Sequence, residues 1–180
     1  TSPEPEEPLL FGIEPVPGDW QPRGAALGDM VHQVMEKIDM SDPEGWLTGH
    51  GAFLGRLYGN DLEEVSRLCL TFFEMELPFD LRASTVLGRE YPYFVRTPEG
   101  IRKRYIDLLL RTPDGKLTVV DYKTDRLDGA GSGDAVEGYM KTQGHYLRDM
   151  ERAFGEKPRG YLVFIRHRLV REVSGSASSG

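Results

Sequence analysis

The sequence predicts a layered α/β domain in which helices flank a mixed β-sheet that contains an antiparallel hairpin. Two observations favour this class. Amphipathic helical patterns occupy residues 24–39 and 61–76, and three strand-like segments then follow one another closely before a further helix and a final strand. Helices, an antiparallel meander and a helix–strand unit, in that order, are typical of a mixed sheet covered by helices.

The first two helices are predicted from the spacing of their apolar side chains. In residues 24–39 and again in residues 61–76, apolar residues recur three and four positions apart, which places them on one face of a helix. Asn60 with Glu63 three positions later is the pattern of a capping box and predicts the start of the second helix. Pro78 ends it, because proline cannot continue a helix.

Three strands are expected next, at residues 86–95, 102–110 and 116–122. These segments are rich in Val, Ile, Leu and Tyr. The turn sequences Thr-Pro-Glu-Gly at 97–100 and Thr-Pro-Asp-Gly at 112–115 separate them. Such short connections predict an antiparallel meander.

A helix and a strand complete the predicted domain. After a Gly-rich loop at 124–133, Asp134 and Glu137 indicate the start of a helix that runs to about Phe154, and a last strand is expected at 160–166.

The domain itself is expected to span residues 23–173. Residues 1–22 contain several prolines, five acidic residues and no Lys or Arg, which is typical of a linker. Residues 174–180, SGSASSG, are of low complexity and indicate a flexible tail. Because the chain begins with Thr rather than Met, we expect the linker to follow a preceding domain.

The composition excludes several classes of site. A single cysteine, Cys69, cannot form an internal disulfide, a Cys-based zinc site or a cysteine-ligated iron–sulfur cluster, and indicates a reducing compartment. No apolar run approaches the roughly 20 residues of a membrane span, and the acidic N-terminus is unlike a signal peptide. A cytoplasmic location without a membrane partner is therefore predicted.

Charge is distributed unevenly along the chain, whose formal net charge is -7. The first 85 residues hold five Lys or Arg and 16 Asp or Glu, whereas residues 86–180 hold 17 Lys or Arg and 13 Asp or Glu. The basic second half is compatible with a nucleic-acid partner despite the acidic total.

Three charged residues stand in strands that are otherwise apolar. Asp107 lies within Tyr-Ile-Asp-Leu-Leu-Leu, and the next strand ends in Asp121-Tyr-Lys123. Strand alternation sends the side chains of Asp121 and Lys123 to one face. Carboxylates that converge across a hairpin suit a hard divalent cation such as Mg²⁺. The plainer interpretation is a Lys–Asp salt bridge at a sheet edge, which leaves Asp107 without a partner.

These residues resemble a known family of nucleases. The sequence places an Asp before a hairpin and an Asp-x-Lys motif after it, an order similar to the core of PD-(D/E)xK nucleases. The longer segment Val-Val-Asp-Tyr-Lys-Thr-Asp-Arg at 119–126 resembles the C-terminal nuclease domain of the AddA and RecB subunits of bacterial helicase-nucleases. Further similar segments are, in the family's order, Gly28-x-x-x-His32, Arg89-Glu90-x-Pro92 and Tyr139-x-x-x-Gln143. The resemblance implies a restriction-endonuclease-like fold over about residues 24–166.

The resemblance also implies roles for individual residues. His32, Asp107, Asp121 and the backbone carbonyl of Tyr122 would hold Mg²⁺, with Mn²⁺ or Ca²⁺ as ions that fit the same site. Asp107, Asp121, Lys123 and Glu90 would be catalytic, with Glu90 binding a second ion or a metal-bound water, and Glu36 would be a partner of His32. Residues expected to support the site or touch the substrate are Gln143, Tyr139, Arg126 and Arg104. The basic residues near enough in sequence to follow the phosphate backbone are Arg89, Arg102, Lys103, Arg104 and Arg126. Arg104 stands where the family often has Gly.

Structural interpretations of two of these residues stay open. A lone His such as His32 on an apolar helix is commonly a satisfied histidine at the edge of a core. Gln143 lies on the apolar side of its helix, where a side-chain amide needs partners in or near the core. Its interpretation is either a local structural hydrogen bond or a buried amide that supports the active site.

The function that the resemblance implies is Mg²⁺-dependent, exonuclease-type hydrolysis of DNA in recombination and repair. The expected partners are single-stranded DNA ends, a helicase motor N-terminal to this chain in the same polypeptide, and a second helicase-nuclease subunit. One alternative is a nuclease-like fold that has lost cleavage and serves as a DNA-binding or docking module. Another is a stand-alone exonuclease or junction resolvase of the same fold.

Overall fold

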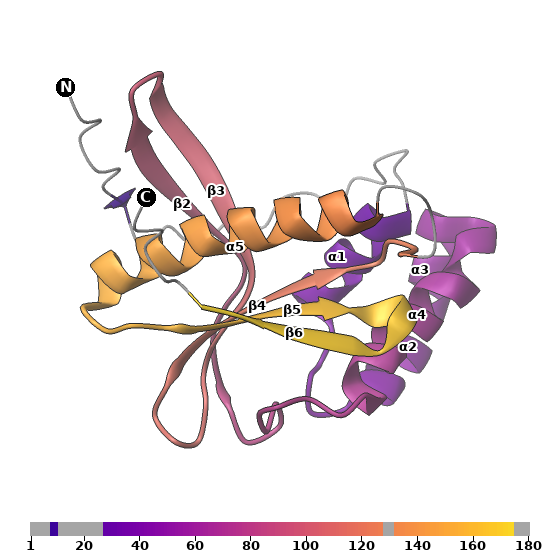
Figure 1. The fold of residues 1–180 in the computed structure, drawn as a ribbon. Coiled ribbons are helices and arrows are strands. Elements are labelled where there is room, and N and C mark those ends of the chain that lie inside the picture. The colour runs from indigo at the N-terminus through magenta and orange to yellow at the C-terminus, as the bar shows by residue number, and fades with distance from the viewer. Residues whose placement is uncertain (1–7, 11–26, 128–131, 175–180) are drawn as a thin grey trace.

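The structure, a computed structural model, describes residues 8–10, 27–127 and 132–174. They form an α/β domain around a mixed sheet (Figure 1). Its helices are α1 (Leu27–Lys37), α2 (Pro43–Gly49), α3 (Gly51–Tyr58), α4 (Leu62–Glu74) and α5 (Ser132–Phe154), with single 3-10 turns at Gly59–Asp61 and Ile165–His167. Its strands are β1 (Pro8–Leu10), β2 (Thr85–Thr97), β3 (Gly100–Arg111), β4 (Leu117–Lys123), β5 (Arg159–Phe164) and β6 (Leu169–Val173).

The strands lie in the order β1-β2-β3-β4-β5-β6. Every neighbouring pair is antiparallel except β4 and β5, which are parallel and are connected through α5. The predicted mixed sheet with an antiparallel hairpin is therefore confirmed. Both four-residue turns of the meander, at 97–100 and 112–115, lie between strands as expected.

Two apolar cores hold the layers together, one on each face of the sheet. Helices α1 to α4 pack against one face, where Val34, Leu68 and Phe72 meet the β4 residues Val120 and Tyr122. On the other face α5 crosses the strands (Figure 1). There the buried residues are Leu147 and Met150 of α5 with strand residues such as Leu109, Val119 and Leu162. The sheet is consequently buried on both faces near its middle.

Three parts of the fold differ from expectation. Helices α2 and α3 were not predicted, and α4 follows a 3-10 turn instead of an Asn60 cap; the residue before it, Asp61, makes no side-chain capping bond. The final segment is two strands, β5 and β6, because Arg168 adopts a left-handed conformation with φ 48° and reverses the chain. Within the segment expected as a linker, Pro8–Leu10 pairs with β2 as β1.

The tail expected at 174–180 lies outside the described residues, apart from Ser174. Among the helices of the described ranges, none combines the length and the apolar character needed to cross a membrane.

Candidate metal centre

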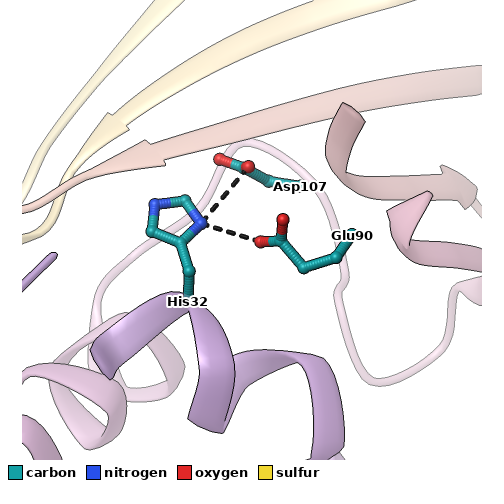
Figure 2. A group of neighbouring side chains, drawn as sticks. All are labelled: His32, Glu90 and Asp107. Carbon is teal, nitrogen blue, oxygen red and sulfur yellow. Dashed lines mark hydrogen bonds and ion pairs between the residues drawn. The ribbon is translucent and has the colours of Figure 1, made fainter. Parts of the chain in front are cut away.

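A histidine and two carboxylates from three different elements converge between α1 and the sheet. His32 comes from α1, Glu90 from β2 and Asp107 from β3, and one ligand atom of each lies within 4.8 Å of the others (Figure 2). The pairing of β2 with β3 explains the two carboxylates, because Arg89 pairs with Leu108 and Tyr91 with Ile106, which sets the intervening residues opposite one another.

Glu90 has an unusual backbone. Its φ is 44°, in the left-handed region that a residue with a side chain seldom occupies. The ladder between β2 and β3 also shifts register between Val86 and Gly88. A Cβ atom at Gly88 would lie 2.5 Å from the ring of Tyr91, so glycine is needed for the close approach of that ring. Such strain requires support from its surroundings and is found preferentially at functional sites.

His32 binds both carboxylates through one nitrogen. Its Nδ1 atom lies 2.8 Å from Glu90 Oε1 and 3.3 Å from Asp107 Oδ1 (Figure 2). Burial by itself would lower the pKa of His32, but the hydrogen bonds and negative charges of Asp107 and Glu90 outweigh it and raise the pKa to about 10. Without a metal, His32 is therefore an imidazolium that neutralises part of the acidic cluster.

Asp107 connects this cluster to β4. Its second oxygen, Oδ2, accepts a hydrogen bond of 3.0 Å from the backbone N–H of Tyr122. The ring of Tyr122 is buried and lies 4.8 Å from the His32 ring, centre to centre. Tyr122 was expected to contribute its carbonyl, which stays a prediction, whereas its N–H and ring are the groups with described contacts to the site.

Asp121 and Lys123 form the other half of the site. Asp121 is buried, and its carboxyl pKa is raised well above the usual range by burial and then by the neighbouring Asp107. Lys123 Nζ lies 3.1 Å from Asp121 Oδ2. That distance makes an ion pair, but the geometry is not that of a hydrogen bond, and among the described residues this oxygen accepts none.

Lys123 is held from two sides. Besides Asp121, it lies over the ring of Tyr139 on α5, with Nζ 4.6 Å from the ring centre. The Tyr139 hydroxyl donates a hydrogen bond to Asp125. Burial lowers the pKa of Lys123, yet the charges of Asp121 and Asp107 reverse the effect and the net pKa shift is upward. Lys123 is therefore a cation at neutral pH.

The donor set fits a hard divalent cation. The buried carboxylates of Asp107 and Asp121 have His32 and Lys123 as their described counter-charges, and Asp121 Oδ2 accepts no described hydrogen bond. Carboxylate oxygens are the ligands that Mg²⁺ prefers. His32, Glu90 and Asp107 are thus the group that could hold such an ion, whereas Asp121, expected as a ligand, lies beside Asp107 but outside this group.

The remaining predicted residues serve mainly as supports. Gln143 is buried and its Nε2 donates to the carbonyls of Val119, at 3.2 Å, and Tyr161, at 3.5 Å, so it ties α5 to β4 and β5. This favours the local structural interpretation, although its Oε1 is buried without a described partner. Arg126 is exposed after β4, and no described hydrogen bond or ion pair joins it to the cluster.

Two arginines that were expected near the substrate have partners within the protein. Arg104 forms an ion pair of 2.8 Å with Asp149 of α5, a buried acid that the sequence did not single out. Arg89, expected near a phosphate backbone, reaches α1 and donates to the carbonyl of Ile38 at 2.5 Å. An arginine at the C-terminus of a helix can donate hydrogen bonds to the last carbonyls of the helix and interacts favourably with the helix dipole.

Glu36 was expected to partner His32. Its Oε1 atom instead lies 3.5 Å from Lys37 Nζ, and Glu90 and Asp107 contact the histidine.

No model of a known protein family matches this chain, and no curated protein matches it either.

Proposed function

We propose that this domain is a Mg²⁺-dependent deoxyribonuclease of the PD-(D/E)xK type with a restriction-endonuclease-like fold. The observation that carries the proposal is the juxtaposition of buried Asp107 and Asp121 with Lys123 on one side and His32 on the other. A structural ion pair explains Lys123 and Asp121, but it does not explain a second buried carboxylate beside them.

Each residue has a role in the proposed hydrolysis. Asp107, Asp121 and His32 hold the ion, and Glu90 binds a further ion or an ion-bound water. The bound ion supplies charge to a phosphoryl oxygen and acidity to a water molecule. Lys123, kept charged by its carboxylate neighbours, orients the attacking water or stabilises negative charge on the phosphate. Tyr139 is a positioning residue because it lies under the ammonium group.

The biological setting that we propose follows from the resemblance in the sequence. DNA is the substrate, the reaction is exonucleolytic, and the setting is bacterial recombination and repair in the cytoplasm. A helicase motor in the same polypeptide and a second helicase-nuclease subunit are the proposed partners. The -7 charge of this chain supports the view that a motor supplies much of the DNA affinity.

A non-catalytic module is the second candidate. It is favoured by one observation, namely that His32 already pairs with both Glu90 and Asp107, through contacts of 2.8 and 3.3 Å. In that case the cluster would be a buried ion-pair network that stabilises a DNA-binding or docking domain.

The test is degradation of end-labelled single-stranded DNA with Mg²⁺ or with EDTA. Wild-type protein is compared with Lys123→Ala and with Lys116→Ala, a matched control at an exposed lysine in the β3–β4 turn. We expect Mg²⁺-dependent cleavage by the wild type and the control, and a loss of about 100-fold or more in Lys123→Ala.

Equal cleavage by Lys123→Ala would place the activity elsewhere. A folded wild type that binds Mg²⁺ and cuts no DNA would favour the non-catalytic module. Calorimetric Mg²⁺ titrations of Asp107→Asn and Asp121→Asn separate these cases, because both variants should bind the ion more weakly if the cluster is the metal centre.

A further inference from the structure

The hairpin of β2 and β3 extends beyond the body of the domain. Figure 1 shows its tip projecting past α5. The two strands pair without interruption from Tyr91 and Ile106 out to Thr97 and Gly100. We refer to this outer part, residues 91–106, as the arm.

One face of the arm is used for packing on α5. Tyr93 donates a hydrogen bond of 2.6 Å to Asp149 of that helix, and Arg104 pairs with the same carboxylate. Val95 and Ile106 are buried on this side. Strand alternation therefore directs their neighbours to the opposite face.

The opposite face combines aromatic rings with cations. Its members, which we call the arm face, are Phe94, Arg96, Ile101, Lys103 and Tyr105. Tyr105 is 46% exposed and Ile101 is 64% exposed. Lys103 Nζ lies 5.0 Å from the centre of the Tyr105 ring and 5.9 Å from that of Phe94. Among the described residues, no ion pair involves Arg96 or Lys103.

We propose that the arm face binds single-stranded nucleic acid, with bases on the aromatic rings and phosphates at Lys103 and Arg96. An exposed ring, Tyr105, and a half-buried one, Phe94, beside lysine and arginine make the kind of platform on which unpaired bases stack, whereas the bases of a duplex already stack on one another. Fold stability does not explain exposed Tyr105 and Ile101 beside two cations, because the arm already packs on α5 through its other face.

The arm face leads towards the candidate metal centre. Asp107 follows Tyr105 by two positions on β3, about 7 Å along the strand. It faces away from α5, because it contacts His32 of α1. A single strand lying on the arm face is thereby directed at Asp107. The inference deepens the proposed function by naming the surface that holds the single strand, and it rests on that function only for the fate of the bound strand.

The test measures binding separately from cleavage. Fluorescence anisotropy of a labelled oligothymidine is recorded in EDTA, with wild type, Tyr105→Ala, Tyr105→Phe, Lys103→Ala and Arg96→Ala. Phe53→Ala, which removes a ring that is 40% exposed on α3, and Lys116→Ala are the matched controls. Circular dichroism and thermal melting establish that each variant is folded.

We expect Tyr105→Ala to weaken binding about 10-fold and Tyr105→Phe to retain it. Lys103→Ala and Arg96→Ala should each reduce the slope of log affinity against log salt by about 0.7, and the controls should leave affinity and slope unchanged. The labelled oligothymidine should bind more weakly when it is paired in a duplex than when it is single-stranded.

Three results would overturn the inference: equal binding by wild type and the arm variants, stronger binding of the duplex, or a dimer in sedimentation that Tyr105→Ala dissociates. Binding lost in the arm variants, together with no Mg²⁺-dependent cleavage by wild type, would uphold the arm face and refute the nuclease. Mg²⁺-dependent cleavage by the wild type, together with arm variants that bind single strands as well as the wild type does, would support the nuclease and refute the arm face.

Discussion

His32 Nδ1 and Glu90 Oε1 lie 2.8 Å apart although 58 positions separate the two residues in the chain. The contact joins α1 to β2 and, through Asp107, to β3. A single proton on His32 thus balances carboxylates of two strands in the metal-free protein.

This relationship predicts that metal uptake releases a proton. The pKa of His32 is raised to about 10, so the ring is protonated at pH 7.5 and must lose its proton before it can ligate an ion. We expect about one proton released per Mg²⁺, and an affinity that rises about tenfold per pH unit towards pH 10. Calorimetry in two buffers with different ionisation enthalpies measures the release. His32→Gln is the control, and release that persists in this variant would contradict the assignment.

The Lys123–Tyr139 contact gives a second prediction. Tyr139→Phe keeps the ring under the ammonium group, whereas Tyr139→Leu removes it. We expect kcat to fall about 10-fold in the Leu variant and less than about 3-fold in the Phe variant, because a partly buried cation–π contact is worth about 1–2 kcal/mol. Single-turnover cleavage of labelled DNA measures the rate. A loss of equal size in both variants would assign the effect to the hydroxyl and Asp125 instead.

A pair of glycines tests the packing of α5 on the sheet. A Cβ at Gly160 of β5 would lie 2.8 Å from both terminal methyl carbons of Leu147, whereas a Cβ at Gly144 of α5 meets nothing within 4 Å. Gly160→Ala should lower the free energy of unfolding by about 1–3 kcal/mol through overpacking. Gly144→Ala should raise it by about 0.5–1 kcal/mol, because alanine is the better helix former. Urea unfolding measures both, and a neutral Gly160→Ala would mean that the Leu147 side chain yields freely.

The buried thiol of Cys69 supplies a probe of the helical layer. Burial raises its pKa to about 12, so about one molecule in 10⁴ carries a thiolate at pH 8. We expect Ellman's reagent to label the folded protein far more slowly than the protein in guanidinium chloride, where one equivalent reacts at once. Labelling should accelerate as the pH approaches 12. Rapid reaction of the native protein at pH 8 would show instead that α4 separates readily from its neighbours.

The meander was predictable because its signals are local. Apolar, β-branched and aromatic residues fill residues 85–123, and Pro-x-Gly turns separate its strands. Helices α2 and α3 were missed because glycines at 45, 49, 51 and 55 interrupt the pattern, although Asp42 before Pro43 is a capping signal that could have revealed α2. β6 was missed because its start depends on the left-handed turn at Arg168.

The candidate site was predictable to the extent that it lies within one hairpin. Asp107, Asp121 and Lys123 converge through strand pairing and alternation, which can be inferred from sequence. The partner of His32 could not be chosen in this way, because Glu36 is nearer in the chain but Glu90 is nearer in space. Asp149, which holds both Tyr93 and Arg104, likewise depends on how α5 lies across the sheet.

The bond from Arg89 to the carbonyl of Ile38 has a consequence for exchange kinetics. Arg89 adjoins Glu90 in β2, so the helix that carries His32 is fastened to the sheet one position from a residue of the candidate metal centre. An ion bound between α1, β2 and β3 would lose its His32 ligand when that helix lifts. Its residence time would then follow the opening of a packed layer, and loosening Arg89 would shorten it without altering any ligand.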